Sequence, residues 1–139
     1  MAGQNLRTLG VFTFSFILLS GVAVFIVWAL ARWVGYEMGS TAAGIPAMVA
    51  ALIAGNSYAR AAGHRPPDAF SWRMALAFSI IAVALSGFFI ALFLPVTDLL
   101  GRMGAGFYLL LAGTFTLYVV AMRVFFAIGA KSRVNAMSR

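Results

Sequence analysis

Few side chains in this sequence could perform acid–base or nucleophilic chemistry, and they do not form a catalytic set. The 139 residues include no cysteine, one histidine and three acidic residues. Glu37, Asp68 and Asp98 fall in predicted loops or at predicted helix ends, whereas a proton-coupled carrier usually has a carboxylate inside the membrane. We therefore predict a protein that is not an enzyme and that has neither a cofactor nor a metal site.

His64 is the only side chain whose unperturbed pKa suits general acid–base catalysis near neutral pH. The sequence has no second histidine with which it could share a metal ion. It also lies beside Pro66 and Pro67 in a polar stretch, as a solvated loop residue would. We therefore assign it no functional role.

Arg123 falls inside an apolar run, and an ionisable residue in such a run is a functional candidate. It lies about five residues, or roughly 8 Å, from the end of the run, so its side chain can also reach the membrane interface. Two interpretations stay open: a structural arginine that snorkels or pairs with Asn56 or Ser57, and a binding site for an anion or a lipid phosphate. Thr114, Thr116 and Tyr118 lie in the same run, and we expect interhelical hydrogen bonds from them.

Composition places these residues in a membrane protein. Hydrophobic residues make up 63% of the chain and charged residues 9%, against roughly 45–50% and about 25% in soluble domains. A soluble fold this apolar could not cover its own surface with polar groups. The net charge of +7 comes from basic residues at the ends of apolar runs, so we expect no binding to nucleic acid.

Four apolar runs have the length of about 20 residues that a membrane-spanning helix needs. They cover residues 9–31, 41–59, 74–94 and 105–128. The runs are too long and too uniformly apolar for barrel strands, and the first is too long for the apolar core of a cleaved signal peptide. We predict a single domain, residues 1–139, that is an all-α membrane protein with a bundle of four transmembrane helices.

The distribution of basic residues predicts the orientation, because cytoplasmic loops are enriched in lysine and arginine. With four spans, both termini and the middle loop share one side. The basic residues of that side are Arg7, Arg60, Arg65, Arg73, Lys131, Arg133 and Arg139. The other side carries only Arg32 and Arg102. We therefore predict a multi-pass protein of the bacterial inner (plasma) membrane, with both termini in the cytoplasm.

Small residues at every fourth position of the second run predict a helix-packing face. They are Gly39, Ala43, Ala47, Ala51 and Gly55. Such a face lets another backbone come close. It could serve packing within the chain, a homodimer or a contact with another membrane protein. Pro46 lies near the outer end of this run, where we expect it to kink the helix.

The polar stretch 54–78 contains the signals that end one helix and begin the next. Gly63 is suited to end the second helix, and Pro66 prevents its continuation. Asp68 could cap the third helix by accepting hydrogen bonds from its first amides. Three basic residues of the stretch could contact anionic lipid headgroups or a partner protein: Arg60, Arg65 and Arg73.

This stretch resembles part of an uncharacterised family of small four-span bacterial inner-membrane proteins, in which a basic R-x-P-type loop joins the second and third spans. The similar segments read AGNSYARAAGHRPP and WRMALAFSI. The matched residues are Ala54, Gly55, Arg60, Gly63, Arg65, Pro66, Trp72 and Arg73. The sequence departs from the family at Asp68, where a glutamate slightly further on is expected. The resemblance implies the architecture and no particular activity.

These features together favour a non-enzymatic accessory or assembly subunit of a larger membrane complex. The alternative is a small homodimeric transporter or channel for an anion or a lipid headgroup. The expected partners are membrane lipid and either another membrane protein or further copies of the chain. The candidate polar or partner-contact positions are Arg123, Asn56, Tyr118, Arg60, Arg65 and Arg73.

Overall fold

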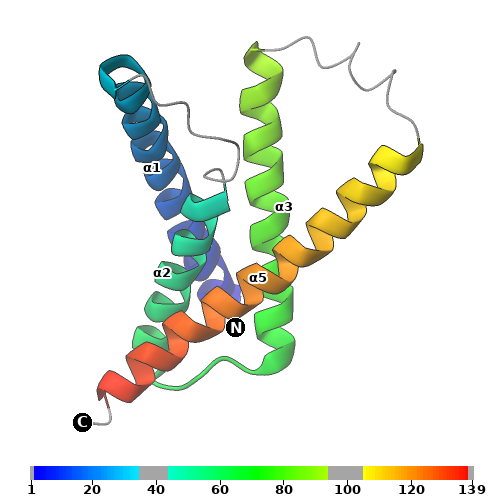
Figure 1. The fold of residues 1–139 in the computed structure, drawn as a ribbon. Helices are drawn as coiled ribbons and strands as arrows, with labels where there is room; N and C mark the ends of the chain where they lie inside the picture. The colour runs from blue at the N-terminus through cyan, green and yellow to red at the C-terminus, as the bar shows by residue number, and fades with distance from the viewer. Residues whose placement is uncertain (1, 35–43, 94–104, 138–139) are drawn as a thin grey trace.

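The computed structural model describes residues 2–34, 44–93 and 105–137, which form four α-helices (Figure 1). The helices are α1 (Ala2–Val34), α2 (Ile45–Ala62), α3 (Asp68–Phe93) and α5 (Ala105–Met137). The prediction of an all-α protein is confirmed for this part of the chain. Three helices, α1, α3 and α5, are long and apolar enough to cross a membrane.

α2 is the short helix of the bundle. Its 18 residues span about 27 Å, whereas the 33 residues of α1 or α5 span about 50 Å. α2 is not among the helices that meet the length and composition of a membrane span. A fourth crossing therefore stays a prediction, and residues 41–43 of the predicted run lie outside the described residues.

Local residue chemistry sets the two ends of α2. Pro46 lies in its first turn, where the missing amide costs no helical hydrogen bond, so it begins the helix and does not kink its interior. At the other end Gly63 adopts a left-handed conformation with φ 72°, and its amide donates to the Ala59 carbonyl at 2.9 Å. The predicted role of Gly63 as a helix stop is confirmed.

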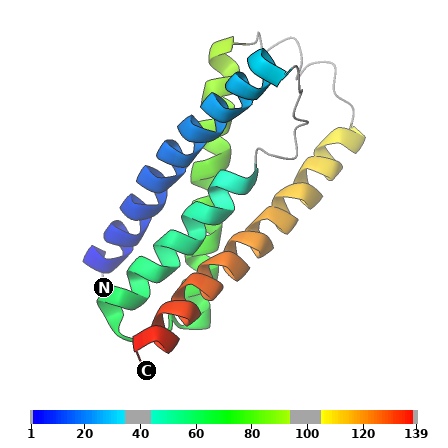
Figure 2. The ribbon, with the colours of Figure 1, turned by 60° about the vertical axis from the view of Figure 1, so that its left-hand side comes forward.

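The helices alternate in direction, so α2 and α5 run parallel to each other (Figure 2). α2 packs between α1 and α5 and makes its most extensive contact with α5, while α3 packs on α5 and α1. The start of α1, the α2–α3 loop and the end of α5 lie at the same end of the bundle (Figure 2).

We call this end the basic end, because most of the basic residues lie there. They are Arg7, Arg60, Arg65, Arg73, Lys131 and Arg133. Arg32 lies near the opposite, distal end, while Arg102 and Arg139 are outside the described residues. The described basic residues from which we predicted the orientation in the membrane therefore lie at one end of the bundle.

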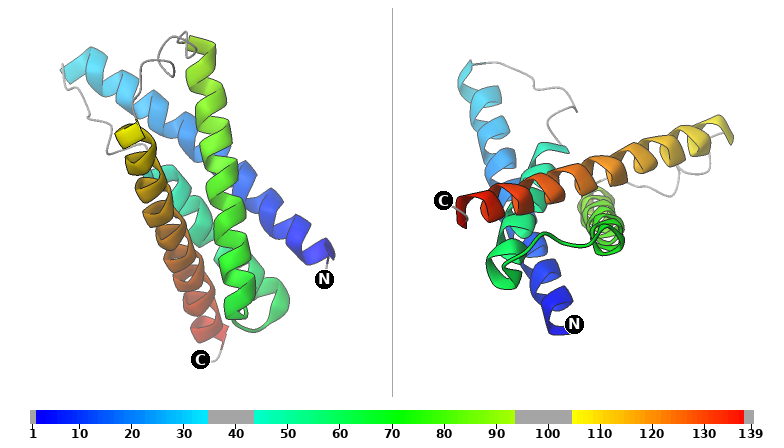
Figure 3. Two further views of the ribbon diagram at one scale, coloured as in Figure 1. Left: turned by 90° about the vertical axis from the view of Figure 1, so that its right-hand side faces the viewer. Right: turned by 90° about the horizontal axis from the view of Figure 1, so that it is seen from below.

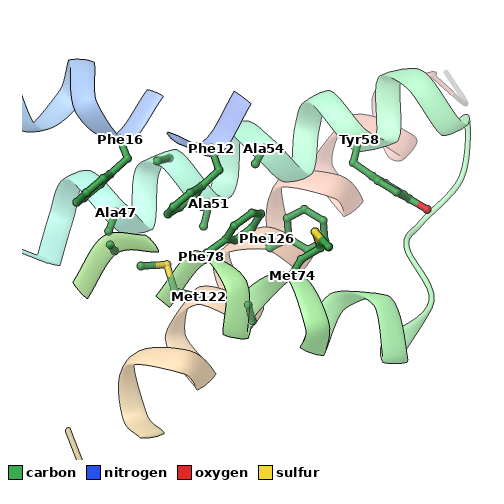
Figure 4. Close-up of a cluster of buried hydrophobic side chains, with 13 residues drawn as sticks. Phe12, Phe16, Ala47, Ala51, Ala54, Tyr58, Met74, Phe78, Met122 and Phe126 are labelled. Carbon is green, nitrogen blue, oxygen red and sulfur yellow. The ribbon is translucent and has the colours of Figure 1, made fainter. Parts of the chain in front are cut away.

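All four helices contribute to one apolar core, which lies in the half of the bundle nearer the basic end (Figure 4). The rings of Phe12 in α1 and Phe78 in α3 stack with centroids 4.1 Å apart and an interplanar angle of 11°. Phe126 of α5 meets Phe78 edge-on at 5.6 Å. Met74 and Met122 complete the centre of the core. The edge-on Phe78–Phe126 pair stabilises the packing beyond simple area burial.

Beyond this core the helices diverge towards the distal end (Figures 1 and 3). Because α2 begins only at Ile45, no described helix fills the space beside the distal parts of the three longer helices. Exposed apolar side chains in these distal parts include Val24, Phe25 and Trp28 of α1, Val83 of α3, and Leu109, Leu110 and Leu117 of α5. The described helices are therefore packed together near the basic end and lie apart at the distal end.

Phe12→Ala should lower the free energy of unfolding by about 3 kcal/mol, because it leaves a cavity between α1 and α3. Phe14→Ala is the matched control, because Phe14 is 71% exposed on the same helix, and it should cost less than about 0.5 kcal/mol. Unfolding in mixed detergent micelles, followed by circular dichroism, measures both. Equal losses for the two variants would contradict this placement of the core.

Candidate functional site

The predicted small-residue face of α2 packs against α5 of the same chain. Its described members Ala47, Ala51 and Gly55 are buried, and Gly39 and Ala43 lie outside the described residues. At Gly55 the helix meets the backbone of α5. A Cβ atom there would lie 3.0 Å from the Phe126 carbonyl carbon and closer still to its oxygen. Only glycine fits at this position without moving the two helices apart.

Gly129 of α5 makes the reciprocal contact. A Cβ atom at this position would lie 2.9 Å from the Leu52 carbonyl carbon of α2 and closer to its oxygen. The contact of Gly129 was not predictable from the local pattern, because this glycine follows the bulky Phe125 and Phe126 in a run without a small residue at every fourth position. The available signal was the adjacent small pair Gly129–Ala130, both of which are buried.

Arg123 pairs with the first turn of α3. Its Nη2 donates a hydrogen bond to Asp68 Oδ1 at 3.0 Å, and its guanidinium carbon lies 4.7 Å from the centre of the Trp72 ring. The side chains of Arg123 and Asp68 are 33% and 89% exposed, so water screens the ion pair and its contribution to stability is about 0.2–1 kcal/mol. The main effect of these contacts of Arg123 is to position α5 lengthwise relative to the first turn of α3.

This pairing changes the predicted role of Asp68. Asp68 is the first residue of α3, and its carboxylate accepts a hydrogen bond from Arg123 rather than capping the first turn. The amide of Ser71 donates to the Pro67 carbonyl at 2.9 Å, and its hydroxyl approaches the same oxygen at 3.2 Å. The negative charge of Asp68 still lies at the favourable end of the helix dipole.

The other predicted polar positions of the bundle interior do not join Arg123. Asn56 is half-buried, and its Oδ1 has no hydrogen-bond partner among the described residues. Tyr118 is half-buried and packs against the core. The hydroxyls of Thr114 and Thr116 donate to carbonyls four residues earlier in their own helix, each at 2.9 Å. The predicted interhelical hydrogen bonds of these two threonines are therefore wrong, because a carbonyl of their own helix is closer.

The basic residues of the α2–α3 loop and its flanks are solvent-exposed. Arg60 and Arg73 are exposed on the last turn of α2 and the start of α3. Arg65 Nη2 donates to Asn135 Oδ1 of α5 at 3.2 Å, which joins the loop to the end of the chain's last helix. His64 is exposed, and its Nδ1 lies 2.8 Å from the Arg65 carbonyl oxygen.

The described residues include no group of three or more metal-binding side chains. An open groove of about 240 Å³ lies between α1 and the start of α2. Its lining is apolar: Leu19, Val22, Ala23, Ile26, Val27, Ile45, Pro46 and Val49. Such a surface suits a hydrocarbon chain or an apolar side chain and offers no group for acid–base chemistry.

No family model, curated protein or solved structure matches the chain. The resemblance to a family of small four-span bacterial inner-membrane proteins therefore stays a prediction. What can be inferred about function depends on the helices and side chains of this protein alone.

Gly55→Ala should destabilise the protein by about 2 kcal/mol, because the added methyl group forces α2 away from the α5 backbone. Gly10→Ala is the matched control, because a Cβ at position 10 meets nothing within 4 Å. It should be neutral or should stabilise the protein by up to about 1 kcal/mol, as alanine is the better helix former. Unfolding in mixed micelles measures both, and the proposed contact fails if the two variants are equally stable.

Proposed function

We propose that this protein is a non-enzymatic accessory or assembly subunit of a larger complex in the bacterial inner membrane. The observation that supports this role is the uneven packing of the bundle. The core is confined to the half near the basic end, and the distal halves of the three long helices diverge. A partner's transmembrane helix would complete the packing that the chain itself leaves open.

Exposed glycines in the distal halves favour a protein partner over lipid alone. Helices associate in membranes through close van der Waals packing, for which small residues are required. Gly55 and Gly129 are each covered by the backbone of a neighbouring helix. At Gly21, Gly87 and Gly113, by contrast, an added Cβ would meet nothing within 4 Å. These positions leave room for a partner's backbone to approach as closely as α2 and α5 approach each other.

The alternative of a homodimeric transporter or channel depends on Arg123 being available for an anion or a lipid headgroup. Its Nη2 is paired with Asp68 and its guanidinium lies over the Trp72 ring, while its buried Nε has no acceptor among the described residues. The groove between α1 and α2 is apolar and offers no polar pathway. These observations support the structural interpretation of Arg123, and we therefore prefer the subunit role.

The proposed topology has four crossings and two cytoplasmic termini. α2 has a length of about 27 Å, close to the 30 Å hydrocarbon thickness of a bilayer. Its less apolar sequence is compatible with a crossing, because α1 and α5 cover much of its surface and reduce its contact with lipid. The excess of basic residues at one end supports a cytoplasmic location for that end.

Single cysteines test this topology, because the natural chain has none. Trp33→Cys and His64→Cys flank α2 at exposed positions, and Ser132→Cys lies near the end of α5. We expect a membrane-impermeant maleimide to label position 33 from the periplasm, and positions 64 and 132 only in inverted vesicles. Labelling of positions 33 and 64 from the same side would show that α2 does not cross the membrane.

Site-specific photo-cross-linking tests the subunit role. A photoreactive amino acid in place of Leu110, which is 69% exposed in the distal half, should cross-link a defined second membrane protein in native membranes. The matched position is Phe14, which is 71% exposed in the half near the basic end and should give only lipid adducts. Mass spectrometry of the adducts identifies the partner.

Gly113→Leu should abolish the Leu110 cross-link and leave the fold intact, because its side chain enters open space. The fold is checked by circular dichroism of the purified variant. Lipid adducts alone at both photoreactive positions, together with recovery of the wild type only as a monomer in mild detergent, would contradict the subunit role.

A further inference from the structure

The basic end carries positive charge that the described residues do not balance. Asp68 is their only acidic residue, and it already pairs with Arg123. The remaining basic side chains of this end have no carboxylate partner within the described ranges: Arg7, Arg60, Arg65, Arg73, Lys131 and Arg133. These side chains are therefore available to an anion from outside the chain.

The ends of α2 and α5 bring part of this charge together. The two helices run parallel and touch at Gly55 and Gly129, so residues at similar offsets beyond these glycines lie at similar depth (Figure 2). Arg60 follows Gly55 by five positions, and Lys131 and Arg133 follow Gly129 by two and four.

The α2–α3 loop adds a fourth basic residue. Arg65 is held against α5 by its hydrogen bond to Asn135 at 3.2 Å. We call the four residues Arg60, Arg65, Lys131 and Arg133 the α2–α5 basic cluster. Arg60, Arg65 and Lys131 are exposed, while Arg133 is half-buried.

Arg133 has an unused donor in this cluster. Its Nε is buried and has no hydrogen-bond acceptor among the described residues. Buried donors in folded proteins are nearly always paired, so an acceptor from outside the chain fits this position. Phosphate oxygens suit it well, because a guanidinium group can bind a phosphate through two parallel hydrogen bonds.

We propose that the α2–α5 basic cluster binds the headgroup of an anionic phospholipid. Apolar side chains continue from the cluster towards the distal end. Ile128 and Val124 of α5 are 48% and 44% exposed, and they precede Lys131 by three and seven residues, or about 5 and 10 Å. Asn135, the hydrogen-bond partner of Arg65, lies on the same side of α5 as Lys131, Ile128 and Val124. A phosphate held by Lys131 and Arg65 would therefore place its acyl chains along this apolar surface. A soluble anion would make no use of it.

The inference goes beyond the subunit role and requires only that the chain lies in a membrane. It concerns a lipid bound at one place, whereas the excess of basic residues that orients a membrane protein acts over the whole end. The two cases differ in which residues matter. In a bound-lipid site the four cluster residues dominate the preference for anionic over zwitterionic phospholipid, and basic residues elsewhere contribute little to it.

Native mass spectrometry of the purified protein measures this selectivity. The protein in micelles is titrated with phosphatidylglycerol or with phosphatidylcholine of the same acyl chains. We expect wild-type protein to bind phosphatidylglycerol about tenfold more tightly or better. The variant R60Q/R65Q/K131Q/R133Q should lose this preference. The control R7Q/R32Q/R73Q, which removes three charges outside the cluster, should retain most of it.

Several outcomes would overturn the proposal. They are an unchanged preference in the quadruple variant, an equal loss in the control, and displacement of the lipid by millimolar inorganic phosphate, which would indicate a soluble anion. Tighter binding of an acidic peptide than of the lipid would indicate a protein partner instead.

If the quadruple variant does not fold, R60Q/K131Q replaces it, because both of these side chains are exposed. This double variant should lose about half of the preference on a logarithmic scale, and an unchanged preference would overturn the proposal. Because the purified chain is tested alone, the result is independent of whether it has a membrane-protein partner.

Discussion

The direct contact between the backbones of α2 and α5 at Gly55 and Gly129 is the constraint on which the rest of the structure depends. In a membrane the hydrophobic effect does not drive helices together, so close packing of this kind must hold them. The contact places Phe126 against Phe78 and Tyr58 in the core. The same contact positions α5 lengthwise, so that side chains of α5 reach the start of α3 and the α2–α3 loop.

From this contact the packing becomes weaker towards the distal end. The aromatic and methionine side chains fill the bundle near the basic end. Two polar contacts connect α5 to its neighbours there: Arg123 binds Asp68 of α3, and Asn135 binds Arg65 of the α2–α3 loop. Towards the other end the helices separate, and apolar side chains face outwards. Among the described residues, one half of the bundle is therefore packed against itself, and the other half is the surface on which the proposed partner would pack.

Local patterns in the sequence predicted the helical class, the stop at Gly63 and the small-residue face of α2, because each depends on residues that are close along the chain. The partner of that face was not predictable, since Gly129 acquires its meaning only when the rotation and depth of α5 are known. The same holds for Arg123, for which the sequence predicted Asn56 or Ser57 as a pairing partner, whereas the structure pairs it with Asp68. The predicted second span was drawn from hydropathy, whereas the described α2 begins next to Pro46. Apolar character predicts burial in a membrane, but it does not predict where a helix begins.

The parallel pairing of α2 with α5 has a consequence for biosynthesis. α1 and α2 are adjacent in the chain and can pack as soon as both have left the ribosome, but α2 makes its larger contact with α5, which is synthesised later. Until α5 arrives, the least apolar helix of the four has one small-residue face uncovered. The small-residue face of α2 is therefore covered only after α5 has been synthesised, and a product that stops before α5 leaves this face exposed.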